Sequence, residues 1–201
     1  GKIADHICEE APVWEAWTGT WESGKYYYLT DKYTLTETIL IEAGQTLNLC
    51  LNGFAFEGAA DVNRMFNVYG VLNICDHKDE HGNYSGRVVG NYDPANGNLK
   101  TGSVFYVQNR TNAVFNLYGG TLTCTTTMTN GGIGGLSGAF KMYDGTITGG
   151  KVTGKGGNLM LESVNAKVFV YGGTITAGVA ADGGNVYIKG IGNLTVDGGT
   201  I

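Results

Sequence analysis

Apolar and polar residues alternate along short stretches of this chain, and these stretches recur at a nearly constant spacing. Each copy reads apolar, any residue, apolar, Tyr or Asp, Gly or Asp, Gly, Thr, and then Leu or Ile. The four copies span residues 115–123, 140–148, 168–176 and 194–201, and their fourth positions are Tyr118, Tyr143, Tyr171 and Asp197. Successive copies are therefore 25, 28 and 26 residues apart, a period typical of solenoids in which each repeat stacks on the next.

The alternation within each copy predicts half-buried β-strands. In the third copy, Val168 and Val170 would face one side of the strand and Phe169 and Tyr171 the other, and the Gly pair that follows would form a bend. A further short strand is expected before three of the copies, at residues 104–107, 158–161 and 185–188. Three short strands per period, without helical periodicity, predict one coil of a parallel β-helix. The expected fold is all-β, a single-stranded parallel β-helix of about six coils.

Stacked coils would bury one continuous column of apolar side chains. We expect this column to contain Leu72, Leu122, Ile147, Ile175 and Ile201. A partial copy at residues 66–72 places Tyr69 about two periods before Tyr118, in the same phase. The Gly-rich segment 131–138 lacks the Lys and the following helix of a phosphate-binding loop, so we interpret it as a flexible bulge.

The first 24 residues differ from the rest, because they contain Trp14, Trp17 and Trp21 in place of the repeat. The first coil of a solenoid needs a cover, and Trp offers the largest apolar side chain for it. We therefore interpret residues 1–24 as an N-terminal cap or linker and residues 25–201 as the β-helix. The chain ends at Ile201 inside an expected strand, so we expect it to be cut from a longer protein with flanking domains.

Composition argues against several functional classes. Of the 201 residues, 34 are Gly and only 2 are Pro, as expected where Pro cannot donate to the hydrogen-bond ladders between coils. The net charge of −5 argues against nucleic-acid binding. No apolar run approaches the roughly 18 residues of a membrane-spanning helix.

Several segments together resemble a known type of module. They are residues 6–8 (His-Ile-Cys), Trp14, Trp17, residues 23–31 (Ser-Gly-Lys-Tyr-Tyr-Tyr-Leu-Thr-Asp), 34–36 and 44–53, and the later Tyr-Gly-Gly-Thr-Ile-Thr units. These segments are similar to the right-handed β-helix modules of large cell-surface proteins from gut-dwelling Gram-positive anaerobes, over nearly the whole chain. The wider family shares its fold with pectate lyases and polygalacturonases. The resemblance implies a right-handed helix, secretion, attachment to the cell wall, and adhesion or glycan contact. It brings no catalytic residue.

The densest polar cluster lies at residues 75–81. Its candidate metal ligands are Asp76, His77, Asp79 and His81, a set able to hold Zn²⁺ or Ca²⁺. Gly82 and Asn83 follow directly and the flanking elements are strands, which favours the alternative of a solvated polar loop. We therefore expect no cofactor.

Catalysis on this fold would require carboxylates on adjacent coils, with a base or a second acid nearby. The outward positions of the repeats carry Tyr, Thr, Asn and Gly instead, and no repeat phase aligns Arg64, Arg87 or Arg110 with acids. We therefore predict no enzymatic activity and no catalytic residue. Should turnover be found, the residues to test are Asp76, Asp79, Glu80 and Asp93.

The tyrosines of the repeats are the candidate ligand-binding residues. Tyr118, Tyr143 and Tyr171, with Tyr69 before them, share a phase opposite to the apolar column. At the coil spacing of about 4.8 Å their rings would form an exposed ladder, and flat aromatic surfaces bind sugars by stacking and also make protein contacts. The alternative is that each ring merely covers a Gly-rich corner.

Cys50 and Cys75 also share a repeat phase, one coil apart. Two thiols this close would pair in an oxidising setting. Because the organisms with similar modules live without oxygen, a stack of unpaired cysteines is the favoured expectation.

Together these features predict a non-enzymatic, adhesin-like module, extracellular and attached to the cell surface. Its partner would be a host or dietary glycan or protein, with no nucleic acid and no membrane span. The alternatives are a polysaccharide lyase or glycoside hydrolase, and a ligand-free rigid stalk. An aligned acid cluster would favour the enzyme, and a featureless Thr/Asn face would favour the stalk.

Overall fold

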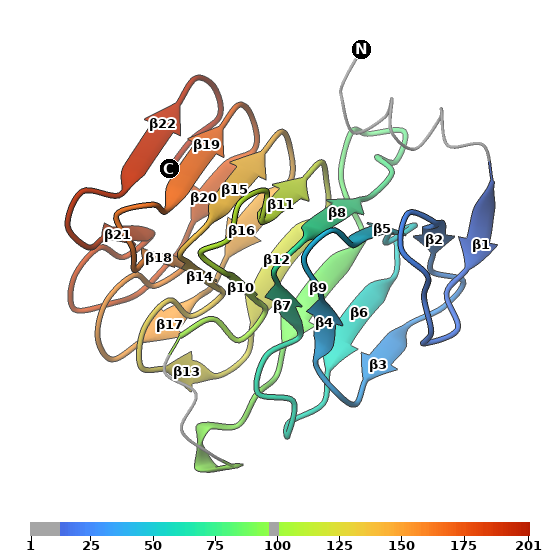
Figure 1. Cartoon of the computed structure of the whole chain (residues 1–201), viewed down its shortest axis with the longest axis horizontal. Coiled ribbons are helices and arrows are strands. Elements are labelled where there is room, and N and C mark those ends of the chain that lie inside the picture. Colours follow the sequence, from blue (N-terminus) through green and yellow to red (C-terminus); the bar gives the residue numbers. More distant parts are fainter. Residues whose placement is uncertain (1–12, 97–100) are drawn as a thin grey trace.

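The computed structural model describes residues 13–96 and 101–201 and is a parallel β-helix, as the repeats predict (Figure 1). Six complete coils each place one strand in each of three sheets, which we call sheets A, B and C. Every strand pairs in parallel with the strand of the next coil. The coils advance from β1 at one end of the molecule to β22 at the other (Figure 1).

The strands are short and their order in each sheet follows the chain. Sheet A contains β1 (Trp14–Ala16), β2 (Tyr26–Tyr28), β5 (Thr46–Cys50), β8 (Val71–Cys75), β11 (Val114–Leu117), β15 (Ala139–Met142), β19 (Lys167–Val170) and β22 (Asn193–Val196). Sheet B contains β3 (Tyr33–Leu35), β6 (Ala55–Gly58), β9 (Arg87–Gly90), β12 (Thr121–Cys124), β16 (Thr146–Thr148) and β20 (Thr174–Thr176). Sheet C contains β4 (Ile39–Ile41), β7 (Phe66–Val68), β10 (Phe105–Val107), β14 (Gly134–Leu136), β18 (Leu159–Leu161) and β21 (Val186–Ile188). A separate pair joins β13 (Thr127–Met128) to β17 (Lys151–Val152), and Pro94–Asn96 forms a single 3₁₀ turn.

The core is built from several apolar columns, one or more for each sheet, rather than one. Leu122, Ile147 and Ile175 are buried register partners in sheet B, as expected. Leu72 was wrongly placed with them, because it pairs with Phe115 in sheet A. The prediction is also wrong for Ile201, which is 41% exposed.

The Gly-rich segment 131–138 is not a flexible bulge but contains the buried strand β14, which lies between β10 and β18 in sheet C. Its glycines are needed because aromatic rings fill the space where side chains would stand. A Cβ atom at Gly134 would overlap the Phe105 ring, and one at Gly135 would meet the Tyr106 ring. Because glycine has no side chain, this strand shows no alternation of apolar and polar residues, and the sequence pattern does not predict it.

The described part of the N-terminal region joins the solenoid directly. Strand β1 pairs in parallel with β2 and so extends sheet A by one strand. Trp17 is buried and meets the rings of Tyr27, Tyr33 and Phe56 edge-on, with centroid distances of 5.6, 5.8 and 5.6 Å. Residues 1–12 lie outside the described residues, and the boundary at residue 24 stays a prediction. No helix in the described ranges is long and apolar enough to cross a membrane.

Candidate functional site on the outer face of sheet A

The candidate site is the outer face of sheet A across β8, β11, β15 and β19. Alternate residues of each strand point outward, so parallel pairing lines them up in columns along the helix axis. The column at the strand ends contains Tyr28, Cys50, Cys75, Tyr118, Tyr143, Tyr171 and Asp197. The column at the strand centres contains Asn48, Asn73, Asn116, Lys141, Phe169 and Thr195.

The tyrosine ladder is present as three stacked rings. Tyr118 and Tyr143 lie with centroids 4.8 Å apart and planes 4° apart. Tyr143 and Tyr171 follow at 5.2 Å and 20°. The Phe169 ring lies 6.2 Å from Tyr171 and is nearly parallel to it, at 5°. The shared repeat phase therefore does bring the three tyrosines together.

The rings differ in exposure, and the expectation of a uniformly exposed ladder is wrong. Tyr118 is only 7% exposed, Tyr143 is half-buried, and Tyr171 is 42% exposed. Burial raises the pKa of Tyr118 to about 12. Tyr118 packs in a small cluster with Cys50 and Cys75, so its ring supports the next one instead of facing a ligand.

Tyr69 does not belong to this ladder, which corrects the fourth predicted ligand residue. It follows β7 in sheet C, and the position of Tyr118 in the preceding coil of sheet A is taken by Cys75. The Arg110 guanidinium lies over the Tyr69 ring, 5.8 Å from its centroid. The phase was misread because β8 and β11 are separated by a longer insertion than the later strands of sheet A.

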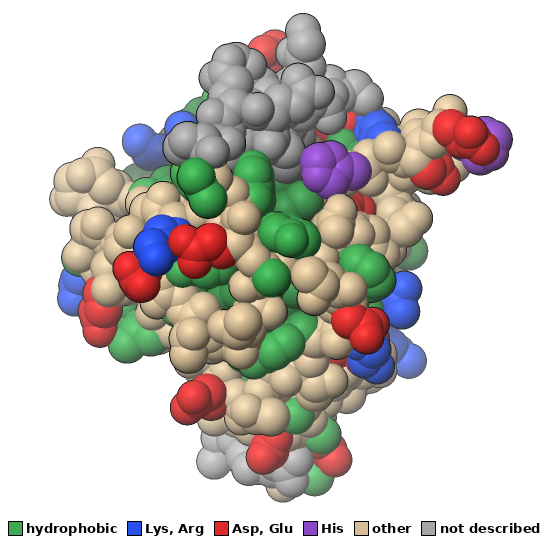
Figure 2. Space-filling view, turned by 90° about the vertical axis from the view of Figure 1, so that its right-hand side faces the viewer, with side chains coloured by type: hydrophobic (Ala, Val, Ile, Leu, Met, Phe, Trp, Pro, Cys, Tyr) green, Lys and Arg blue, Asp and Glu red, His purple; other side chains and the backbone are tan. Residues whose placement is uncertain are grey.

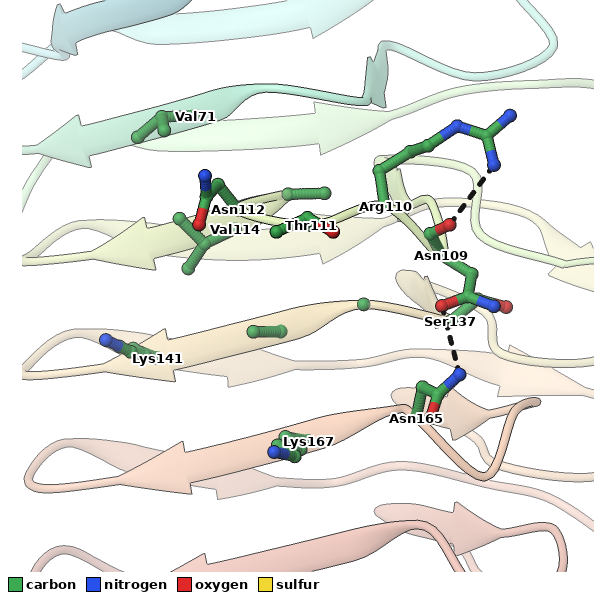
Figure 3. A pocket seen from close by; sticks show the side chains of 13 residues that line it. Val71, Asn109, Arg110, Thr111, Asn112, Val114, Ser137, Lys141, Asn165 and Lys167 are labelled. Carbon is green, nitrogen blue, oxygen red and sulfur yellow. Dashed lines mark hydrogen bonds between the residues drawn. The ribbon is translucent and has the colours of Figure 1, made fainter. Parts of the chain in front are cut away.

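A groove of about 580 Å³ lies at the other edge of this face, where the chain enters β11, β15 and β19 (Figure 3). Val114 and Ala139 form part of its apolar floor. The Asn165 amide donates to Asn109 Oδ1 at 3.2 Å, joining two of its turns. The Arg110 guanidinium donates to the Asn109 carbonyl at 3.3 Å.

The groove is cationic. Arg110, Lys141 and Lys167 line it from three successive coils, and no acidic residue is among its lining residues (Figure 3). Sequence analysis missed this site because its three cations have no common repeat phase. Arg110 lies in the turn before β11, Lys141 lies within β15, and Lys167 is the first residue of β19.

Comparison of the chain with protein-family models, curated proteins and solved structures finds no match. The function of the face is therefore argued from its geometry alone.

An amide ladder occupies the centre of the face before Lys141. The Asn73 amide donates to Asn48 Oδ1 at 2.7 Å, and the Asn116 amide donates to Asn73 Oδ1 at 2.8 Å. Each amide thus satisfies its neighbour in the adjacent coil. In the following coils Lys141 and Phe169 replace Asn, so the polar ladder gives way to charged and aromatic side chains.

The four predicted metal ligands are not assembled into one site. Asp76 is buried and accepts hydrogen bonds from the backbone N–H groups of Gly53 and Gly86, both at 2.7 Å. Asp79 accepts from the N–H groups of His81 and Asn83 and so closes the loop turn. Figure 2, viewed from the end that carries β1, shows the two described His side chains at separate places on the surface. Within residues 13–96 and 101–201, no group of three or more His, Cys, Asp or Glu side chains gathers for a metal. His77 itself is exposed.

The loop that contains these residues is anchored to the solenoid by a salt bridge. Lys78 Nζ lies 2.8 Å from Asp144 Oδ2 and 4.7 Å from the centroid of the Tyr84 ring. Burial opposes ionisation of Asp144, but the hydrogen bonds from Lys78, Gly145 and Tyr84 outweigh it, so that the pKa of Asp144 lies below its usual value. The loop is therefore held on the surface as a docked element.

A second polar cluster lies on sheet C, around Arg64 and Glu162. The Arg64 guanidinium lies over the Tyr106 ring at 4.6 Å, and the Tyr106 hydroxyl donates to Glu162 Oε2 at 2.7 Å. Thr101 also donates to Glu162, at 2.7 Å, and Arg64 donates to the carbonyls of Thr101 and Gly102. Burial raises the pKa of Tyr106 to about 12, which makes it a poor general base. These contacts tie the segment that enters β10 to the sheet.

The cysteines also depart from expectation. Cys50 and Cys75 are register partners, but Cys50 is free and buried whereas Cys75 is disulfide-bonded. The expectation of an unpaired stack is therefore wrong for Cys75. Its disulfide partner is not a described residue, since Cys50 and Cys124, the other described cysteines, are both free.

Proposed function

We propose that this chain is a non-enzymatic, adhesin-like binding module of an extracellular cell-surface protein, and that the outer face of sheet A holds a host or dietary glycan. The observation that carries the proposal is the exposed ring of Tyr171 at the end of a stacked aromatic ladder. Sugars present C–H faces that pack on aromatic rings.

The ladder provides a preorganised surface. Tyr118 is fixed by burial, Tyr143 stacks on it, and Tyr171 stacks on Tyr143. In the next coil the same position holds Asp197, so no ring of this column covers the far side of Tyr171. Stacking on Tyr143 already orders the Tyr171 ring. A ligand that packs on it would therefore restrict the ring little further, and the entropic cost of binding would be low.

Polar groups beside the rings suit a carbohydrate. Phe169 widens the aromatic surface on the same strand, and Asp197 offers carboxylate oxygens that accept hydrogen bonds from sugar hydroxyls. The groove lies at the other end of β19, about 13 Å from Tyr171 by the rise of four strand residues. A face of this length suits an oligosaccharide.

The test is binding of soluble polysaccharides to the whole chain by isothermal titration, with the wild type, Tyr171→Ala and a control, Tyr187→Ala. Tyr187 is a half-buried tyrosine on sheet C, away from the proposed face. Tyr171→Ala is expected to weaken binding by about 1–3 kcal/mol and to leave folding intact, whereas the control binds as the wild type does.

Two results would contradict the proposal. One is the absence of binding to any glycan, which would favour the rigid stalk. The other is the release of reducing or unsaturated ends above a heat-inactivated control, which would identify an enzyme.

A further inference from the structure

We infer that the glycan is anionic, and that the groove lined by Arg110, Lys141 and Lys167 binds its carboxylate or sulfate groups. The inference rests on the proposed function and names the ligand class of the same face.

The first argument is the pairing of charges. Within the described residues, five other cations form salt bridges with acids, namely Lys25, Lys32, Lys78, Arg87 and Lys155. The other described cations, Arg64, Arg110, Lys141, Lys151, Lys167 and Lys189, form none. Of these six, Arg110, Lys141 and Lys167 line the one groove, although the chain as a whole carries a net charge of −5. An acidic chain that gathers unpaired cations in one groove creates a local positive potential, which favours an anion there.

The second argument is the geometry of the groove. Lys141 and Lys167 stand on adjacent strands and are offset by two residues, so their Cα atoms are about 8 Å apart by the strand rise and spacing. The Asn109–Asn165 pair lies along the same groove and offers amide groups to hydroxyls (Figure 3). Charges separated in this way, with amides between turns, suit a polymer that carries one charge on each of several sugar units.

The third argument distinguishes a glycan from nucleic acid, the other common polyanion. Phe169 and Tyr171 lie further along β19, the strand that begins with Lys167, and a sugar ring can stack on them there. Nucleic-acid binding instead depends on a large excess of Lys and Arg, and this chain has 13 of these against 18 acids.

The experiment compares polymers that differ only in charge. Polygalacturonate is titrated against the same polymer with its carboxylates fully methyl-esterified, and dextran sulfate against dextran, with single-stranded DNA as a further probe. The charged member of at least one pair is expected to bind roughly tenfold more tightly than its neutral partner at low salt, and less so at 0.15 M salt. The pair that shows the difference tells whether carboxylate or sulfate is the preferred group.

The variants test the location of the anion. Lys141→Gln combined with Lys167→Gln is expected to abolish the difference between charged and neutral polymers. Lys151→Glu is the matched control, because it changes the net charge by the same amount at an exposed residue of β17, outside sheet A. It is expected to keep the preference for the charged polymer.

The outcomes separate this inference from the proposed function. If the neutral polymers bind and the charged ones bind no better, the inference is wrong while the glycan proposal survives. If no polysaccharide binds, the proposed function itself fails. The inference would also be overturned if Lys151→Glu lost the preference for charged polymers as fully as the double variant does. Binding of DNA as tight as binding of polygalacturonate would have the same meaning, because either result would indicate a non-specific polyanion effect.

Discussion

Tyr118 and Tyr143 stack almost perfectly parallel, 4.8 Å apart, yet they have different environments: the ring of Tyr118 is buried and that of Tyr143 is half exposed. The ladder therefore begins inside the protein and ends at its surface with Tyr171. The same residue type at the same repeat position serves the fold at one end of the ladder and is available to a ligand at the other.

This gradient predicts effects of different size for the same substitution at two positions. Tyr118→Ala is expected to lower the free energy of unfolding by about 3 kcal/mol, because it leaves a cavity beside Cys50 and Cys75. Tyr171→Ala is expected to cost less than about 1 kcal/mol, since its ring is partly in water already. Urea denaturation measures the free energy of unfolding of both variants. Equal losses of stability would contradict the prediction that the buried ring and the exposed ring have different roles.

The buried strand β14 predicts a steric coupling between two residues of sheet C. Gly134→Ala is expected to destabilise the chain by about 1–3 kcal/mol, because the new methyl group overlaps the Phe105 ring. Phe105→Leu in the same chain should recover part of the loss. A double-mutant cycle measures the coupling, and simple additivity of the two changes would argue against the contact.

The free cysteines are expected to be chemically inert in the folded protein. Burial raises the pKa of the Cys50 thiol to about 12 and also raises that of Cys124, so both stay protonated at pH 8, and the thiolate is the reactive form. Mass spectrometry after iodoacetamide treatment should find neither residue modified in the native state and both modified in urea. Rapid native alkylation of Cys50 would contradict its buried position.

Asp76 is expected to stabilise the fold through its two backbone hydrogen bonds. In Asp76→Asn the amide nitrogen cannot accept from an N–H, so either Gly53 or Gly86 loses its partner, at a cost of about 1–3 kcal/mol. Thermal unfolding of the variant measures the loss.

The pH dependence of that loss has a definite sign. Burial raises the pKa of Asp76, in spite of the N–H groups that favour its ionised form. The folded state then holds a proton that the unfolded state releases, so the contribution of Asp76 is greatest below the unfolded-state pKa of about 3.9 and decreases as the pH rises through the folded-state pKa. The stability difference between wild type and Asp76→Asn should therefore shrink over this range, and a difference that grows with pH would contradict the shift.

The repeat period and the alternation determined much of the fold without any structure. Val168 and Val170 are buried and Tyr171 is exposed as predicted, because side-chain alternation is a local property of a strand. The stacking of Tyr118, Tyr143 and Tyr171 was also predictable, since regular spacing keeps equivalent residues in register from coil to coil.

Only the tertiary structure decided the features that depend on register across insertions and on contacts between coils. The insertion between β8 and β11 shifts the phase, so Tyr69 belongs to sheet C and Cys75 takes the place assigned to it. The strand that contains Gly134 fits because aromatic rings fill the space where its side chains would stand. A run of glycines shows no alternation of apolar and polar residues, so the sequence does not predict this strand. The cationic groove is lined by Arg110, Lys141 and Lys167, which share no sequence pattern and are brought to one face because three successive coils stack in parallel.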